Sequence, residues 1–153
     1  MEATMTIWKL RAGRGLAAVV AMVGLSVMVP VGAAQAGTSC SYLTGCSRVG
    51  NNSWLRATAR HNWTCGWGTT GSSSTGCVGG DSMNLYHWEA TPDGQDWDVV
   101  QVDAGWCYRI HFVNGWGKVW DVRYDRRGQS NLYVKVENGA WGTVEDQSSS
   151  GCP

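Results

Sequence analysis

Short segments in which apolar and polar residues alternate are the feature that most restricts the fold of this chain. The clearest is 105–113, where apolar side chains at even positions alternate with Cys107, Arg109, His111 and Val113. A period of two residues is typical of a strand with one buried face. Six further segments show the pattern less strictly: 53–65, 82–90, 96–103, 117–124, 131–137 and 140–146.

Turn signals separate several of these segments: Pro92-Asp93-Gly94, Asn114-Gly115, Asp125-Arg126-Arg127-Gly128 and Asn138-Gly139. Asn-Gly is a strong hairpin signal because both residues tolerate a positive φ. After residue 36 no segment has the 3.6-residue apolar period of an amphipathic helix. The sequence therefore predicts an all-β fold, a small antiparallel sandwich or barrel of about seven short strands, stapled by disulfides.

The first 36 residues resemble a secretory signal peptide. Basic residues at 9, 11 and 14 precede an uncharged apolar stretch from Gly15 to Val31, and Ala34-Gln35-Ala36 fits a signal-peptidase site. A membrane anchor is the alternative, but Pro30 interrupts the stretch and no basic cluster follows it. We expect residues 1–36 to be removed, residues 37–153 to form a single domain, and the product to be extracellular, monomeric and without a membrane anchor.

All six cysteines follow residue 36: Cys40, Cys46, Cys65, Cys77, Cys107 and Cys152. An even number of cysteines in a short exported chain indicates disulfides. We predict pairing between neighbours in the sequence, 40 with 46, 65 with 77 and 107 with 152. The alternative, a zinc site, is disfavoured because no two cysteines have the C-x-x-C spacing.

The net charge argues against nucleic acid as a partner. The leader contains three of the 12 basic and one of the 12 acidic residues, so 9 basic and 11 acidic residues follow it. A chain that is slightly acidic is not expected to bind nucleic acid through its phosphates. The carboxylates of Asp93–Asp98 could donate oxygens to Ca²⁺, but their spacing is not that of an EF-hand. We therefore expect no metal and no cofactor.

Tryptophan is the strongest candidate for a binding function. Three of the nine tryptophans after the leader precede a glycine and lie in or beside a predicted turn: Trp67, Trp116 and Trp141. Aromatic rings displayed on turns can bind sugar rings or a protein surface, or they can fold back and cover the core. We predict a secreted, non-enzymatic domain that binds extracellular carbohydrate or cell-wall polymer. Inhibition of a foreign hydrolase by loop 66–76 is a second binding hypothesis.

A catalytic hypothesis rests on two pairs of residues that share a strand face, His87 with Glu89 and Arg109 with His111. If the two strands were neighbours, the four side chains would form a cluster suited to acid–base cleavage of a phosphodiester. The alternative function is therefore a small secreted hydrolase of the ribonuclease type.

Overall fold

The computed structural model describes residues 40, 45–66, 71–73 and 75–153. The expected leader lies outside these residues, so its removal stays a prediction. Within the described residues the regular elements are strands and one short 3-10 helix, Thr75–Cys77. No helix in this part of the chain has the length and apolar character needed to cross a membrane.

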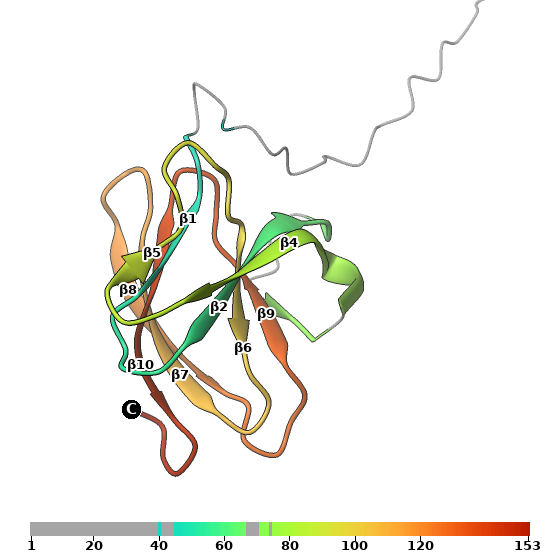
Figure 1. Ribbon diagram of the computed structural model, residues 1–153, viewed down its shortest axis with the longest axis vertical. Coiled ribbons are helices and arrows are strands. Elements are labelled where there is room, and N and C mark those ends of the chain that lie inside the picture. Colours follow the sequence, from blue (N-terminus) through green and yellow to red (C-terminus); the bar gives the residue numbers. More distant parts are fainter. Residues whose placement is uncertain (1–39, 41–44, 67–70, 74) are drawn as a thin grey trace, which may run out of the picture. The chain divides into compact units, whose positions relative to one another are not determined.

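The strands form two five-stranded sheets, which confirms the predicted all-β sandwich (Figure 1). The strands are β1 Arg48–Asn51, β2 Ala57–Trp63, β3 Gly71–Ser72, β4 Val78–Leu85, β5 Glu89–Ala90, β6 Val99–Val102, β7 Cys107–Val113, β8 Val119–Asp125, β9 Leu132–Lys135 and β10 Trp141–Ser148. The first sheet has the order β5-β1-β10-β7-β8, and the second has the order β3-β9-β6-β2-β4. All strand pairs are antiparallel except β1 with β10.

The strand pattern differs from the prediction in several places, among them β3, which no predicted segment covers, and β4, which begins at Val78. The segment 82–90 is not one strand, because β4 ends at Leu85 and β5 begins at Glu89 in the other sheet. The crossing between the sheets contains Trp88, whose φ of 64° is left-handed. A left-handed residue reverses the chain locally and ends the extended strand. The alternation also does not predict β1, which pairs with a strand far away in the sequence.

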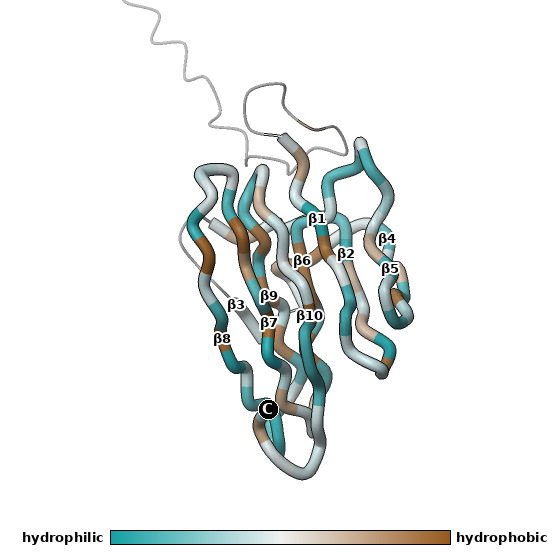
Figure 2. Tube along the Cα trace, turned by 90° about the vertical axis from the view of Figure 1, so that its left-hand side faces the viewer, coloured by the Kyte–Doolittle hydropathy of each residue, from teal (hydrophilic) through white to brown (hydrophobic). Residues whose placement is uncertain are grey.

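The core lies between the inner faces of the sheets. On β7, Tyr108, Ile110 and Phe112 are buried, none more than 4% exposed, as the alternation predicts. Cys107, which belongs to the other set of the alternation, is also buried and forms a disulfide. The second sheet contributes Ala57, Ala59, Val100, Val102 and Val134 to the same cluster. Hydrophobic residues fall on the strands, including β6, β7 and β9, while several connecting loops are hydrophilic (Figure 2). Burial of this apolar surface is the main force that holds the sheets together.

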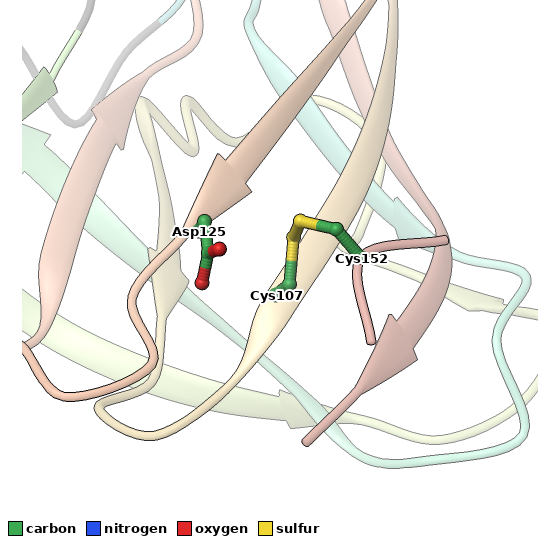
Figure 3. Close-up of side chains that lie close together, drawn as sticks. All are labelled: Cys107, Asp125 and Cys152. Carbon is green, nitrogen blue, oxygen red and sulfur yellow. A yellow bond between two sulfur atoms is a disulfide. The ribbon is translucent and has the colours of Figure 1, made fainter. Parts of the chain in front are cut away.

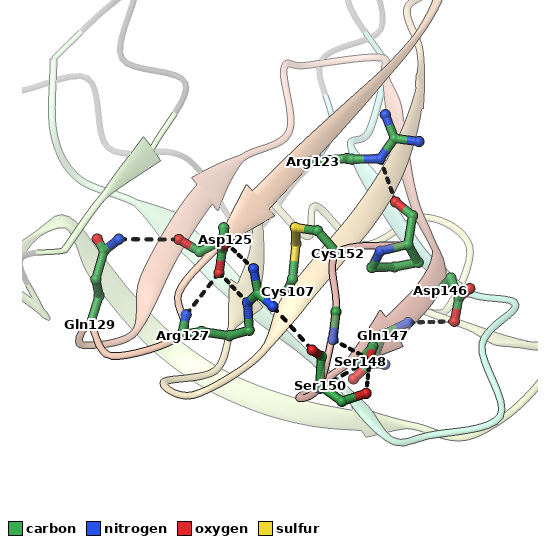
Figure 4. Close-up of a disulfide and its surroundings, with 12 residues drawn as sticks. Cys107, Arg123, Asp125, Arg127, Gln129, Asp146, Gln147, Ser148, Ser150 and Cys152 are labelled. Carbon is green, nitrogen blue, oxygen red and sulfur yellow. Dashed lines mark hydrogen bonds and ion pairs between the residues drawn. A yellow bond between two sulfur atoms is a disulfide. The ribbon is translucent and has the colours of Figure 1, made fainter.

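The three predicted disulfides are confirmed. The Cα atoms are 4.6 Å apart for Cys40–Cys46, 4.8 Å for Cys65–Cys77 and 5.1 Å for Cys107–Cys152. The second bridge closes the connection between β2 and β4. The third fastens the segment after β10 to the start of β7 (Figure 4).

Candidate functional site

Trp116 lies at the tip of the β7–β8 hairpin and is 95% exposed. The turn spans Asn114 to Lys118 rather than only Asn114-Gly115, and its left-handed residue is Gly117, with φ 76°. The side-chain oxygen of Asn114 accepts hydrogen bonds from the backbone nitrogens of Trp116 at 3.1 Å and Lys118 at 2.9 Å. The asparagine thus fixes the turn by local hydrogen bonds, and the turn holds Trp116 outward.

Trp141 begins β10 and is 41% exposed. The β9–β10 turn passes close to the β7–β8 hairpin, because a Cβ atom added to Gly115 would lie 3.4 Å from the carbonyl oxygen of Gly139. The two turns therefore bring Trp116 and Trp141 to the same end of the first sheet. Trp67, the third predicted binding residue, and most of the tip of loop 66–76 lie outside the described residues.

Neighbouring side chains extend this aromatic end across the sheet. Trp141 pairs in register with Val113, which pairs with Val119. Paired residues in a sheet point to the same face, and alternation with buried Phe112 places this row on the outer face. We call Trp116, Trp141, Val113 and Val119 the hairpin-tip platform.

Arg48 completes the platform on the side of β1. Its guanidinium lies 4.1 Å from the centre of the Trp141 ring, a favourable cation–π arrangement. The same guanidinium donates to the carbonyl oxygen of Thr91 at 2.9 Å and pairs with Asp93. Arg48 is thus held from two directions, and it supports the Trp141 ring.

A polar row lies two residues further along the same strands. Thr143 pairs with His111, which pairs with Asp121. His111 Nδ1 is 2.6 Å from Asp121 Oδ1, and Arg109 lies 4.0 Å from the other carboxylate oxygen. The side chains of His111 and Asp121 are 35% and 50% exposed. We call Thr143, His111 and Asp121 the polar row.

The sequence pattern did not predict a second exposed aromatic cluster, formed by Trp54, Tyr86 and Trp88 around His87. Trp54 is 85% and Trp88 73% exposed. The Trp54 and His87 rings stack with centroids 3.7 Å apart, and His87 Nδ1 donates to the carbonyl oxygen of Ser53 at 3.0 Å. The signal that was available is the run Tyr86-His87-Trp88, three ring-bearing residues that break the alternation.

The four residues of the catalytic hypothesis do not come together. Glu89 lies on β5 and His87 just before it, whereas Arg109 and His111 lie on β7. Strands β1 and β10 separate β5 from β7, so the two pairs are not on neighbouring strands. Glu89 instead accepts a hydrogen bond from the backbone nitrogen of Tyr86 at 2.8 Å.

The acidic segment Asp93–Asp98, a possible source of calcium ligands, buries two of its carboxylates. Asp96 and Asp98 are 4% and 1% exposed. Both contact the Ser47 hydroxyl, at 2.9 and 2.8 Å, and Asp96 also accepts from the Ser47 backbone nitrogen at 2.6 Å. Burial raises the pKa of Asp98 above its usual range. These contacts secure the residue that precedes Arg48.

Cys107, Asp125 and Cys152 form a group with metal-like proximity, since one ligand atom of each lies within 4.8 Å of the others (Figure 3). Both sulfur atoms belong to the disulfide, so neither is a thiolate ligand. Asp125 is bound by Arg127, whose NH2 and Nε atoms lie 2.6 and 2.9 Å from its two carboxylate oxygens (Figure 4). Hydrogen bonds from Arg127 lower the pKa of Asp125 to about 2.

A hollow of about 350 Å³ lies on the second sheet, at a bulge between β2 and β4. It is lined by His61, Asn62, Gly80, Asp81 and Gln95. His61 is fixed there by a stack on Trp97 at 3.9 Å and by a 2.7 Å hydrogen bond from Nδ1 to the carbonyl oxygen of Asp96.

Comparison of the whole chain with models of known protein families, with curated proteins and with solved structures found no match.

Proposed function

We propose that this chain is a secreted, non-enzymatic domain that binds an extracellular polysaccharide through the hairpin-tip platform. The observation that carries the proposal is the 95% exposure of Trp116 on a turn fixed by Asn114, at the same sheet end as Trp141. An exposed indole loses the hydrophobic stabilisation that it would gain by burial. A ligand that covers the ring recovers this free energy.

The platform suits a sugar ring better than a flexible peptide. Stacking needs an apolar surface of about the size of one ring. Trp141, Val113 and Val119 form an apolar row on the outer face, at the sheet end whose turn carries Trp116. The surface is also held before binding, by the Asn114 hydrogen bonds and by Arg48. A preorganised surface loses little conformational entropy when it binds.

Secretion is supported by the three disulfides, which persist in oxidising compartments. The leader pattern predicts that the mature chain begins at Gly37. Intact-mass analysis of the protein recovered from the medium of an expressing bacterial culture should show the mass of residues 37–153 with three disulfides. Retention of the full-length chain in the cells would contradict this part of the proposal.

Binding is tested by tryptophan fluorescence during titration with soluble polysaccharides and with fragments of peptidoglycan. We expect a saturable change with the preferred polymer, abolished in Trp116→Ala and Trp141→Ala. Trp54→Ala is the matched control, because it removes a tryptophan of similar exposure elsewhere on the domain. An unchanged spectrum with every polymer, or equal loss in the control, would overturn the proposal.

An acid–base hydrolase is the second candidate, favoured by the 2.6 Å contact between His111 and Asp121. A carboxylate that orients an imidazole is a common device of general-base catalysis. The second acid–base group was expected to be His87 or Glu89, which β1 and β10 keep apart from His111. RNA turnover by wild type that disappears in His111→Ala would establish this candidate in place of the first.

A further inference from the structure

The polar row lies beside the hairpin-tip platform in a fixed geometry. His111 is two residues before Val113 on β7, and Val113 is the register partner of Trp141. His111 and Trp141 are therefore diagonal neighbours on one face, with Cα atoms about 7–8 Å apart. A sugar ring stacked on the Trp141 indole would place the edge of the sugar over the polar row.

The polar row offers both donors and acceptors to such an edge. His111 Nδ1 contacts the Asp121 carboxylate at 2.6 Å, which leaves Nε2 of the ring to hydrogen-bond a ligand. The Thr143 hydroxyl both donates and accepts, and the carboxylate of Asp121 accepts. Arg109, which contacts the same carboxylate at 4.0 Å, adds donors at the far side of the row. Adjacent hydroxyl groups of a sugar, each a donor and an acceptor, match this mixture.

Charge on the outer face is balanced. The row beyond the polar row contains Asp146, Arg109 and Arg123 in register, and Asp121 lies next to it. Asp125 on β8 and Arg48 on β1 also lie at this face, and each forms an ion pair with a residue of opposite charge, Arg127 and Asp93 respectively. Basic and acidic side chains therefore occur in similar numbers around the polar row. A strongly anionic or cationic polymer would meet like charges as often as opposite ones, which costs free energy on binding. The balance favours a neutral ligand.

We infer that the platform binds a neutral polysaccharide and that His111 and Asp121 are the residues that recognise its hydroxyl groups. This inference rests on the proposed function and adds the ligand class and the specificity-determining residues. Trp116 and Trp141 bind a sugar by stacking, and stacking does not distinguish one sugar ring from another. The polar row supplies the selection among sugars, because a buried hydrogen-bonding group left without its partner opposes binding.

The experiment measures the affinities of the mature protein for mixed-linkage β-glucan, xylan and mannan, and for alginate as the anionic polymer. Each neutral polymer is also used after O-methylation, which removes hydroxyl donors and keeps the rings. The variants are His111→Gln, Asp121→Asn and Trp141→Ala. Arg60→Gln is the control, because Arg60 lies on β2 of the other sheet. Thermal unfolding shows that each variant is folded.

We expect wild type to prefer one neutral polymer over alginate and to lose about tenfold or more in affinity when that polymer is methylated. His111→Gln and Asp121→Asn should bind the unmethylated polymer about tenfold more weakly and be insensitive to methylation. Trp141→Ala should lose both forms, and Arg60→Gln should behave as wild type.

The remaining outcomes separate the two proposals. If Trp141→Ala abolishes binding while His111→Gln and Asp121→Asn bind as wild type, this inference is wrong and the proposed function stands. Preference of wild type for alginate would overturn the neutral ligand class in the same way. Absence of binding to every polymer, or binding that Trp141→Ala leaves unchanged, would overturn both.

Discussion

Two regions of this domain expose tryptophan, and they do so by different physical means. At the hairpin-tip platform, Trp116 stacks on none of the described rings, and its backbone nitrogen is hydrogen-bonded to the side chain of Asn114. In the second cluster, Trp54 stacks on His87, and Trp88 has a left-handed backbone. The first region presents a ring that contributes little to folding, and the second uses its rings partly to hold neighbouring loops.

The difference has a consequence for function. A ring already packed on a protein neighbour has one face fewer for a ligand, which holds for Trp54 on His87 and for Trp141 under Arg48, whereas Trp116 is 95% exposed and has both faces free. We therefore assign binding to the platform and a partly structural role to Trp54.

Removal of the Cys107–Cys152 bridge should have the largest effect, because it fastens the segment after β10 to β7, a strand of the platform. Replacement of both cysteines by alanine should lower the free energy of unfolding by about 2–4 kcal/mol. Urea denaturation measures this loss. The stack of Trp54 on His87 involves neither cysteine, so near-ultraviolet circular dichroism of the folded variant should retain the contribution of this stack. A decrease in the free energy of unfolding of less than about 0.5 kcal/mol would contradict the role of this bridge in fastening the segment after β10 to β7.

Trp54→Ala and Trp116→Ala test the comparison directly through stability. Loss of the 3.7 Å stack on His87 should destabilise Trp54→Ala by about 0.5–1.5 kcal/mol. Trp116→Ala should change stability by less than about 0.5 kcal/mol, because the ring is almost wholly exposed. Urea unfolding of both variants provides the values. The reverse order of the two losses would break the distinction between the regions.

Trp88 allows the backbone contribution to be isolated. Trp88→Ala and Trp88→Gly both remove the ring contact with His87, but only alanine retains the cost of a left-handed backbone at φ 64°. After subtraction of the extra chain entropy of glycine, the glycine variant should be more stable by about 0.5–1 kcal/mol. If thermal unfolding gave the same corrected stability for Trp88→Ala and Trp88→Gly, the left-handed backbone at this position would carry no energetic cost for a residue with a side chain.

The sequence predicts the regular part of the fold well because its signals are local. Alternation locates β7, β8 and β9, and pairing of neighbouring cysteines is correct for all three bridges, although Cys107–Cys152 spans β7 to β10. The parallel pairing of β1 with β10 joins residues such as Arg48 and Trp141, far apart in the sequence, and no local pattern encodes it. The left-handed backbone at Trp88 opposes the preference of a bulky residue, so the break in 82–90 was also hidden.

The candidate site was predictable to a similar degree. The turn signals in the sequence predict Trp116 and Trp141. The position of the turn from Asn114 to Lys118 would also have predicted the pairing of His111 with Asp121. Counting back from this turn pairs Val113 with Val119 and then His111 with Asp121. Trp54 could not be found this way, because its exposure depends on the loop after β1 and on a stack with a residue from another loop.

The most direct test of the account is a two-dimensional ¹H–¹⁵N NMR titration of the labelled mature domain with the preferred polysaccharide. The indole N–H signals are assigned by single tryptophan substitutions. The account predicts that the signals of Trp116 and Trp141 shift progressively while those of Trp54 and Trp88 stay in place. Shifts confined to Trp54 and Trp88 would contradict it and assign ligand binding to the other region.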